Sequence, residues 1–502
     1  MQPEKQLQEL KIRTNEIFDL MRAAAVLGWD QQTYMPPGGA ANRGQQLATL
    51  QSIAHDKSTS PEIGRLLDDL QPYVSQLDPD SFDARLVKVT RRAYERDVKV
   101  PSEWVAEFAL TTTAAYEAWG KARAENNFPL FQPHLEKILD LAHRYAGFFA
   151  PYDHIYDPLV DIFEPGLKTA DIKVIFDSLR PQQVSLIKKI TSVPQVDNSF
   201  MHLHYDEQKQ WDFGVEIITK MGYDWQRGRQ DKTLHPFTTS FGWGDTRITT
   251  RVYPDFLAPA LFGTLHETGH AMYELGADPS LDRTPLYGGA SSGIHESQSR
   301  MWENLVGRSL PFWQNFYPRL QEIFPAQLGN LALEAFYKGI NKVQPSLIRV
   351  EADEATYNLH IMLRMELEID LMEGTLAVKD LPEAWNSRFQ EYLGLTPPDN
   401  SQGVLQDVHW SGGMIGYFPS YALGNLIAAQ LWELINRDIP NLPDQIRRGE
   451  FAPWLAWLRQ KIHVHGSKFE PQELIQKVTG SKIDPAPYMR YLTAKYSEIY
   501  GL

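Results

Sequence analysis

The sequence predicts a mainly α-helical protein that carries one small β element, and two observations lead to this prediction. Apolar residues recur at helical spacing along most of the chain, as Leu10, Ile17 and Met21 do near its start. One stretch, residues 232–253, is instead rich in threonine, aromatic and β-branched residues. The chain has 502 residues, of which 43% are hydrophobic, so it is long enough to bury a large core.

The predicted elements follow one another in one continuous domain, 1–502, with two parts, 1–230 and 231–502. In the first part the apolar pattern predicts helices near residues 6–27, 102–126, 131–152 and 169–190, with a break at the Pro-Pro-Gly-Gly run 36–39. Residues 232–253 predict a hairpin or small sheet, because Gly242, Gly244 and Asp245 offer turn chemistry. Helices resume after it, interrupted by loops near 276–293, 396–402 and 409–416.

Composition excludes several classes of function. The formal net charge of −14 gives no general attraction to nucleic acid or to anionic lipid. The chain has no cysteine, which rules out disulfides, thiolate metal ligands and cysteine nucleophiles. The polar N-terminal stretch and the lack of a long apolar run predict neither a secretory signal nor a membrane span. We therefore expect a cytoplasmic protein without nucleic-acid or membrane partners.

Residues 266–270 read H-E-T-G-H, an H-E-x-x-H motif in a stretch with helical character. His266 and His270 are four residues apart, so on a helix both imidazoles lie on one face and reach one ion. Glu267 stands beside them and is the candidate general base toward the attacking water. The alternative is a chance match, which the helical context disfavours.

A catalytic site of this type needs a third protein ligand and leaves one position open. Glu296 is the candidate, on a second predicted helix for which Ser292 is the expected N-cap. Taken alone, Glu296 is as well explained as a solvated surface carboxylate, and its neighbour His295 as a structural histidine or a partner of a ligand. The resulting set of two histidines and one glutamate predicts one divalent ion per chain, zinc by default and cobalt or manganese as alternatives.

Beside H-E-T-G-H, several ordered motifs lie along essentially the whole chain. They are W-D-Q-Q-T at 29–33, H-P-F at 235–237, D-T-R-I-T at 245–249, H-E-S-Q at 295–298, I-R-V-E-A-D-E-A-T-Y at 348–357 and G-V-L-Q-D-V-H-W at 403–410. Together these motifs resemble those of the thermostable metallocarboxypeptidase family called carboxypeptidase Taq.

The resemblance implies a large helical metallopeptidase fold with a deep substrate groove, a metal at its floor and a homodimer. It also implies the metal-dependent release of C-terminal residues from peptides, with a broad side-chain preference. Stabilisation of the tetrahedral oxyanion requires hydrogen-bond donors beside the metal. His409 and Tyr421 are the candidates, and Tyr417 is the rival of Tyr421; core packing is the alternative role for both tyrosines.

An exopeptidase must also recognise a free carboxylate, for which the planar fork of arginine is suited. Arg349 is the first candidate, at the start of an expected long helix that ends near Gly374; its alternative role is a salt bridge to Asp353. Arg247 is the second candidate, and His235 is a candidate pocket residue. The acidic residues of the expected helix are interpreted as a solvated face or as partners of arginines rather than as a second metal site; they are Glu351, Asp353, Glu354, Glu366, Glu368 and Asp370.

Two other functions remain open at this point. An oligopeptidase that cuts internally or releases dipeptides would use the same motif without depending on a free C-terminus. A catalytically silent peptide-binding protein is the alternative from another class, although such a protein would have no need for Glu267 as a base.

Overall fold

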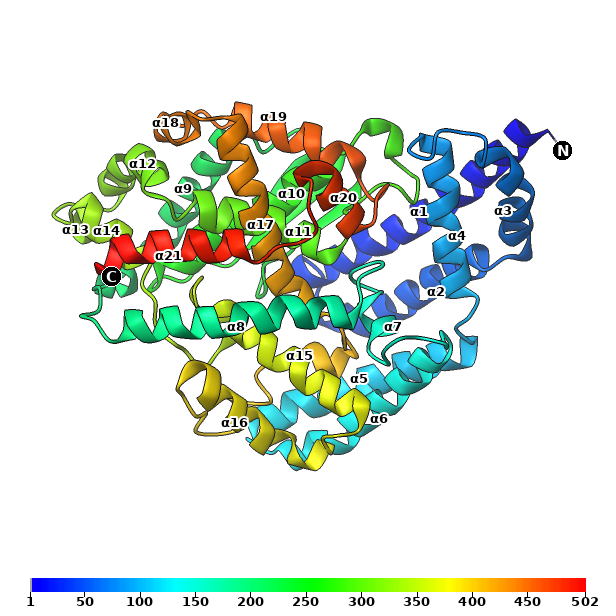
Figure 1. Cartoon of the computed structure of the whole chain (residues 1–502), viewed down its shortest axis with the longest axis horizontal. Helices are drawn as coiled ribbons and strands as arrows, with labels where there is room; N and C mark the ends of the chain where they lie inside the picture. The colour runs from blue at the N-terminus through cyan, green and yellow to red at the C-terminus, as the bar shows by residue number, and fades with distance from the viewer. Residues whose placement is uncertain (1) are drawn as a thin grey trace.

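The computed structural model describes residues 2–502. The first four helices form an arm at one end of the molecule, at the upper right of Figure 1, which we call the N-terminal arm. They are α1 (Pro3–Thr33), α2 (Ala40–Ser58), α3 (Pro61–Val74) and α4 (Phe82–Asp97). The arm has its own small core, in which Leu10, Leu67 and Leu86 pack with Leu286 and Tyr287 from a loop far along the chain. The predicted helix 6–27 is confirmed and is longer at both ends.

The remaining helices of the first part lead into the body of the molecule. They are α5 (Ser102–Ala124), α6 (Phe128–Gly147), the short α7 (Asp157–Val160), α8 (Thr169–Thr191) and α9 (Glu207–Met221). The three predicted helices in this region are confirmed, with ends moved by a few residues. The helix expected at 131–152 begins earlier because Pro129 suits the first turn of a helix.

A three-stranded sheet follows, with β1 (Gly228–Lys232), β2 (Thr238–Gly242) and β3 (Asp245–Thr250). The strand order is β1-β3-β2; β1 runs parallel to β3, and β2 runs antiparallel to it. The predicted hairpin corresponds to β2 and β3. Strand β1 lies almost wholly before the predicted segment, because its polar sequence G-R-Q-D-K has no strand pattern and its pairing with β3 is a tertiary contact.

The second part of the chain is helical again. Its helices are α10 (Leu257–Leu275), α11 (Ser292–Arg300), α12 (Leu310–Ile323), α13 (Pro325–Leu328), α14 (Leu333–Ile340), α15 (Tyr357–Glu373), α16 (Leu381–Leu393), α17 (Phe418–Asp438), α18 (Leu442–Arg447), α19 (Ala452–Lys461), α20 (Pro471–Thr479) and α21 (Ala486–Tyr500). The predicted loops lie between these helices, and residues 409–412 form a single 3₁₀ turn. The N-terminus and the C-terminus lie at opposite ends of the molecule (Figure 1).

Helix α11 is packed tightly between α10 and α17, because a glycine on each neighbour lets the backbones approach. A Cβ at Gly269 of α10 would lie 2.6 Å from Cα of Ser299 on α11. A Cβ at Gly424 of α17 would lie 2.6 Å from Cβ of Glu296, also on α11. The two glycines therefore set the depth at which Glu296 sits in the core.

Two sequence-based expectations about helix starts are corrected. The N-cap of α11 is Ser291, whose side chain accepts a hydrogen bond from the N–H of Ile294, and not Ser292. The long helix expected from Arg349 onward begins at Tyr357, since Arg349–Glu351 form a separate 3₁₀ turn. Asp353 accepts hydrogen bonds from the N–H groups of Ala355 and Thr356. These bonds fix the turn that separates the 3₁₀ turn from α15.

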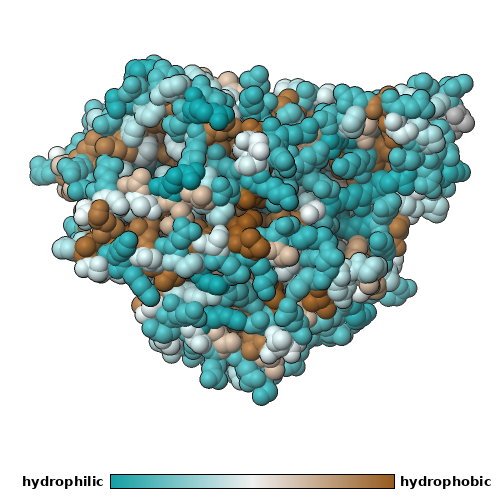
Figure 2. Space-filling view, in the orientation of Figure 1, coloured by the Kyte–Doolittle hydropathy of each residue, from teal (hydrophilic) through white to brown (hydrophobic). Residues whose placement is uncertain are grey.

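The main core extends through the body from α5 to α21, separate from the core of the N-terminal arm. The view in Figure 2 shows a mostly hydrophilic surface with hydrophobic residues in scattered groups. In the described part of the chain, 2–502, no helix combines the length and apolarity that a bilayer crossing requires. The assignment of the chain to one continuous domain stays a prediction.

Candidate metal site and substrate cavity

His266, His270 and Glu296 meet at one point. The two histidines lie one turn apart on α10, so both imidazoles project from the same face. Glu296 comes from α11, and its Oε2 lies 3.7 Å from Nε2 of His266 and 3.4 Å from Nε2 of His270. Within residues 2–502, these three form the one group of His, Asp and Glu side chains that is close enough to share an ion.

The spacing of these atoms fits a divalent ion. Two ligand atoms bound at about 2.0–2.1 Å in tetrahedral geometry lie roughly 3.3 Å apart, close to the separations seen here. Two imidazoles and one carboxylate also form the ligand set of catalytic sites that keep one position open. The fold thus brings together the three residues that the sequence predicts as ligands.

Buried charges hold Glu296 and His266 in place. Arg300 donates to Oε1 of Glu296 (2.7 Å) and to Oε2 of Glu303 (3.1 Å), and Nδ1 of His266 lies 2.8 Å from that same Glu303 oxygen. Burial alone would raise the pKa of Glu296, but the charge of Arg300 above all, together with its interactions with the two histidines, holds that pKa far below its usual range. Glu296 therefore stays a carboxylate, as a metal ligand must.

A second chain of hydrogen bonds orients His270. Its Nδ1 lies 2.6 Å from Nδ1 of His295, whose Nε2 lies 2.8 Å from Oε1 of Glu274. For Nε2 of His270 to be free for an ion, its Nδ1 carries the proton and donates to His295, which in turn donates to Glu274. Burial lowers the pKa of His270 to about 4, which keeps the ring neutral. His295 is thus a partner of a ligand.

Glu267 lies beside the ligands and lines the same cavity. Its Oε2 accepts a hydrogen bond from Oγ1 of Thr238 (2.7 Å), the first residue of β2. Burial raises the pKa of Glu267. A raised pKa suits a carboxylate that must accept a proton and return it near neutral pH.

The cavity has a volume of about 760 Å³ and is lined by residues of α4, β2, α10, α11 and α17 and of the loops around them. Tyr417 and Tyr421 line it together with the candidate ligands, Glu267 and Thr238. Burial raises the pKa of Tyr421 well above its usual value, so its hydroxyl stays a donor. His409 lies behind it, with Nε2 3.2 Å from the Tyr421 hydroxyl.

Arg349 lies buried behind Tyr421, its guanidinium 5.0 Å from the centre of that ring. Its Nε donates to Asp407 (2.9 Å) and its Nη1 to the hydroxyl of Tyr357 (2.9 Å). The expected alternative, a salt bridge to Asp353, is wrong, because Arg349 precedes the helix and turns toward Asp407 instead. Arg364 donates to the other oxygen of Asp407 (2.6 Å). Two arginines thus share one aspartate, which leaves an excess positive charge behind Tyr421.

The structure brings none of Arg349, Arg247 and His235 into the cavity wall, although Arg349 lies directly behind Tyr421. Arg247 donates to Asp245 from both Nε and Nη2 and stacks over Trp29 of α1, with 4.4 Å to that ring. It faces away from Thr238, because side chains at neighbouring register positions point to opposite faces of a sheet. His235 is exposed, although the three residues after it line the cavity.

Four residues around the site were not identified from the sequence. Thr238 holds Glu267, Arg300 and Glu303 hold two ligands, and Glu274 ends the chain that orients His270. Helical spacing offered one signal, because Arg300 and Glu274 each follow a predicted ligand by four residues. Glu303 lies in the π-helical turn Met301–Val306, which periodicity does not foresee.

A helical fold with an H-E-x-x-H helix, a glutamate ligand from a second helix and an adjacent glutamate in one cavity defines a metallopeptidase. The family model described as "Carboxypeptidase Taq (M32) metallopeptidase" matches residues 9–496. The chain belongs to this family, so it is a peptidase that uses a divalent metal ion. The predicted resemblance is confirmed.

Relatives and solved structures agree with this assignment. The chain is 42% identical to thermostable carboxypeptidase 1 of Thermus thermophilus over the full length of both, and 38% identical to carboxypeptidase 1 of Bacillus subtilis over 98% of this chain and 100% of the relative. It also resembles the crystal structure of the M32 carboxypeptidase from Deinococcus radiodurans, with a TM-score of 0.96, 40% identity and coverage of 99% of this chain and 100% of that one. The predicted fold class is thereby confirmed.

Proposed function

We propose that this protein is a zinc-dependent carboxypeptidase that removes residues of varied chemistry from the C-terminus of peptides. The observation that carries the proposal is the meeting of the ligand set and Glu267 in one cavity, with excess positive charge behind one wall. The cavity of about 760 Å³ is larger than a single side chain, which supports a broad preference.

Each step of peptide hydrolysis has a candidate group. An ion on His266, His270 and Glu296, zinc by preference and cobalt as the alternative, would supply Lewis-acid activation of the water and of the scissile carbonyl. Glu267, oriented by Thr238, takes the proton of the attacking water and delivers it to the leaving amine. Tyr421 donates to the oxyanion as it forms.

His409 and Tyr417 support Tyr421 in this proposal. His409 holds the Tyr421 hydroxyl through its Nε2, and Tyr417 packs edge-on against the Tyr421 ring, with centroids 5.1 Å apart. His409 then acts on the reaction through Tyr421, whereas Tyr417 lines the cavity and remains the rival donor.

The substrate carboxylate is proposed to bind at the Tyr421 end of the cavity. Arg349 and Arg364 share only Asp407, so one positive charge at this end is not neutralised by an acidic partner within that cluster. A carboxylate placed there gains favourable electrostatic energy in a partly dehydrated site. Arg349 is preferred over Arg247, because Arg247 lies on the face of the sheet opposite Thr238, whereas Arg349 lies behind the Tyr421 ring that lines the cavity.

The test uses one peptide as the free acid and as the C-terminal amide, with zinc or cobalt and after chelation. We expect stepwise C-terminal losses from the free acid alone, read by mass spectrometry and abolished by the chelator. Arg349→Met should raise KM for the free acid, whereas Arg247→Met serves as the matched control and should leave KM unchanged. Internal cuts in both peptide forms would identify an oligopeptidase, and metal binding without cleavage would identify a silent binder.

A further inference from the structure

The N-terminal arm encloses a second hollow, which we call the arm hollow. It has a volume of about 470 Å³ and is lined mainly by apolar side chains, among them Ile17, Phe18 and Met21 of α1, Ile63 of α3 and Ala93 of α4. Met21 is 48% exposed there. Filling an apolar hollow that is open to water with an apolar group lowers the free energy, because apolar surface is removed from water. Such exposed apolar surfaces mark binding sites.

The arm hollow lies next to the metal-binding cavity. Pro285 lines both of them, and it belongs to the loop that joins α10 to α11, the two helices that carry the candidate ligands. On α4, Val89 faces the metal-binding cavity, whereas Thr90 and Ala93 face the arm hollow. The two hollows therefore meet along α4 and at Pro285.

The wall of the arm hollow is tied to the metal site. Arg22 of α1 lines the hollow and donates from Nη1 to the main-chain oxygen of Ser240 on β2 (2.7 Å). Its guanidinium also stacks over Phe18, 4.6 Å from the ring centre. Strand β2 carries Thr238, which holds Glu267, so the hollow keeps a fixed position relative to the base.

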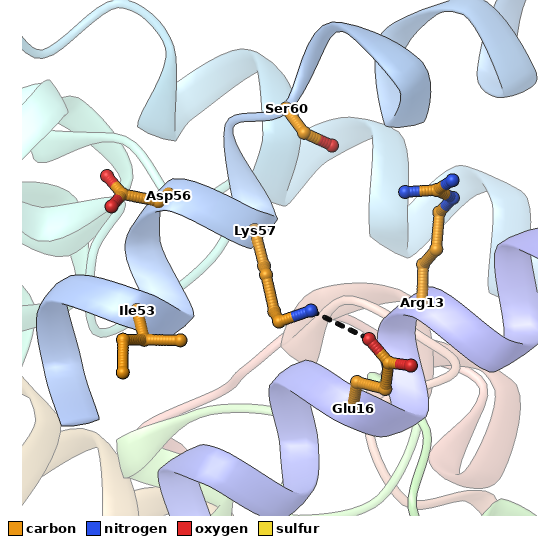
Figure 3. A pocket seen from close by; sticks show the side chains of 6 residues that line it. All are labelled: Arg13, Glu16, Ile53, Asp56, Lys57 and Ser60. Atoms are coloured by element: carbon orange, nitrogen blue, oxygen red, sulfur yellow. Dashed lines mark hydrogen bonds and ion pairs between the residues drawn. The ribbon is translucent and has the colours of Figure 1, made fainter.

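A third hollow, between α1 and α2, is small and has a charged lining, so it serves as a comparison for the arm hollow. Figure 3 shows its lining, in which Lys57 forms an ion pair with Glu16 (2.8 Å) beside Arg13, Asp56 and Ile53. Its volume is about 230 Å³, and it shares no lining residue with either the metal-binding cavity or the arm hollow. Ile53 is 41% exposed, so it offers a matched control for Met21.

We propose that the arm hollow is a distal subsite, which binds an apolar side chain of the peptide substrate upstream of the residue that is removed. The inference rests on the proposed carboxypeptidase function, in which the C-terminal carboxylate occupies the Tyr421 end. The rest of the peptide must then leave the metal-binding cavity by another wall. Val89 and Pro285 form the part of the cavity wall that borders the arm hollow, so a peptide that leaves the cavity on this side reaches the hollow.

The test uses peptides of equal length with the same C-terminal residue, in which one leucine moves through successive upstream positions of a polar background. We expect kcat/KM for release of the last residue to rise by about tenfold at one position, the gain from burying one leucine side chain. Met21→Asn should remove most of this gain, and Ile53→Asn should leave it intact. A peptide too short to reach the arm hollow should be cleaved equally well by all three proteins.

Binding of the same peptides to the chelated protein, measured by calorimetry, separates this inference from the proposed function. A leucine preference that Met21→Asn abolishes would support the subsite even if no peptide were cleaved. Affinity and kcat/KM that are independent of leucine position, or a preference that Met21→Asn leaves unchanged, would overturn it. Failure to cleave the short peptide would instead contradict the carboxypeptidase assignment.

Discussion

Glu267, the proposed general base, shows how the surroundings of one side chain set its orientation and its pKa. It follows His266 directly on α10, and Thr238 from the sheet fixes one of its oxygens. Burial raises the pKa of Glu267 and so brings this pKa closer to neutral pH. The motif predicts the residue, but the hydrogen bond that orients it comes from a strand about thirty residues earlier.

Replacing the base should separate catalysis from metal binding. We expect Glu267→Gln to lower kcat by about 10²–10⁴-fold, since a positioned general base contributes that much to the rate. The amide cannot take the proton but has nearly the same size, so the metal content by atomic emission should equal that of the wild type. A rate within tenfold of the wild type would contradict the role of Glu267.

Glu368 is a second carboxylate with an unusual environment, and here the sequence-based interpretation was wrong. It was expected on a solvated face or beside an arginine, but it is fully buried and accepts hydrogen bonds from Tyr156, Trp410 (2.8 Å) and the N–H of Gly416 (3.0 Å). Burial raises the pKa of Glu368 to about 7, although these donors oppose the shift. Glu366 and Asp370, by contrast, do pair with arginines.

The raised pKa of Glu368 makes stability depend on pH. The folded pKa lies above the unfolded value of about 4.3, so the folded state binds more protons between the two. The contribution of this group to stability is complete below about pH 4 and is lost as the pH rises through about 7.

Calorimetry at several pH values should detect this group. We expect the melting temperature of Glu368→Gln to fall less between about pH 5 and about pH 7 than that of the wild type. The exposed Glu383→Gln on α16 is the control and should follow the wild type. Parallel curves for all three proteins would show that Glu368 does not titrate in this range.

At the level of elements, the contact of α10, α11 and α17 decides where Glu296 lies. Gly269 and Gly424 have no side chain, which allows the backbone of α11 to approach both neighbours. Helix α11 begins at a serine cap and continues into the π-helical turn that supplies Glu303. Small residues at these crossings thus have a direct consequence for the metal site.

A methyl group at either crossing should disturb metal binding. Gly269→Ala and Gly424→Ala should each destabilise the fold by about 1–3 kcal/mol and weaken zinc affinity, because the new Cβ collides with α11. Gly263→Ala is the control on the same helix α10: a Cβ there meets no atom within 4 Å, so helix propensity should raise stability by about 0.5–1 kcal/mol. Melting temperatures and chelator competition measure both quantities. Unchanged zinc affinity in Gly424→Ala would contradict this account.

At the level of the whole molecule, the metal site lies where two cores meet. The main core holds α10, α11 and α17, while the N-terminal arm contributes α4 and packs against the loop between α10 and α11. The metal-binding cavity and the arm hollow both lie along this junction. The two hollows are therefore lined by segments that lie far apart in the chain, from α1 to the residues just before α20.

Metal removal should lower the stability of the whole molecule. An ion that binds only the folded state adds RT ln(1 + [L]/Kd) to the free energy of unfolding, about 4 kcal/mol at a thousandfold excess over Kd. The melting temperature should therefore rise by several degrees with added zinc and fall after chelation. His270→Ala should abolish this dependence, whereas His204→Ala, an exposed histidine, should keep it. A zinc effect that persists in His270→Ala would place the stabilising ion elsewhere.

The sequence by itself determined the helical class, the motif helix, the candidate ligands and the family, because these depend on local spacing and ordered motifs. Only the tertiary structure decided the partners of Arg349, the burial of Glu368, the position of Arg247 outside the cavity and the contact of Thr238 with Glu267. Each of these is a contact between segments distant in the chain, and side-chain periodicity reports only which face of its own element a residue occupies. Which neighbour covers that face is settled when helices and strands pack.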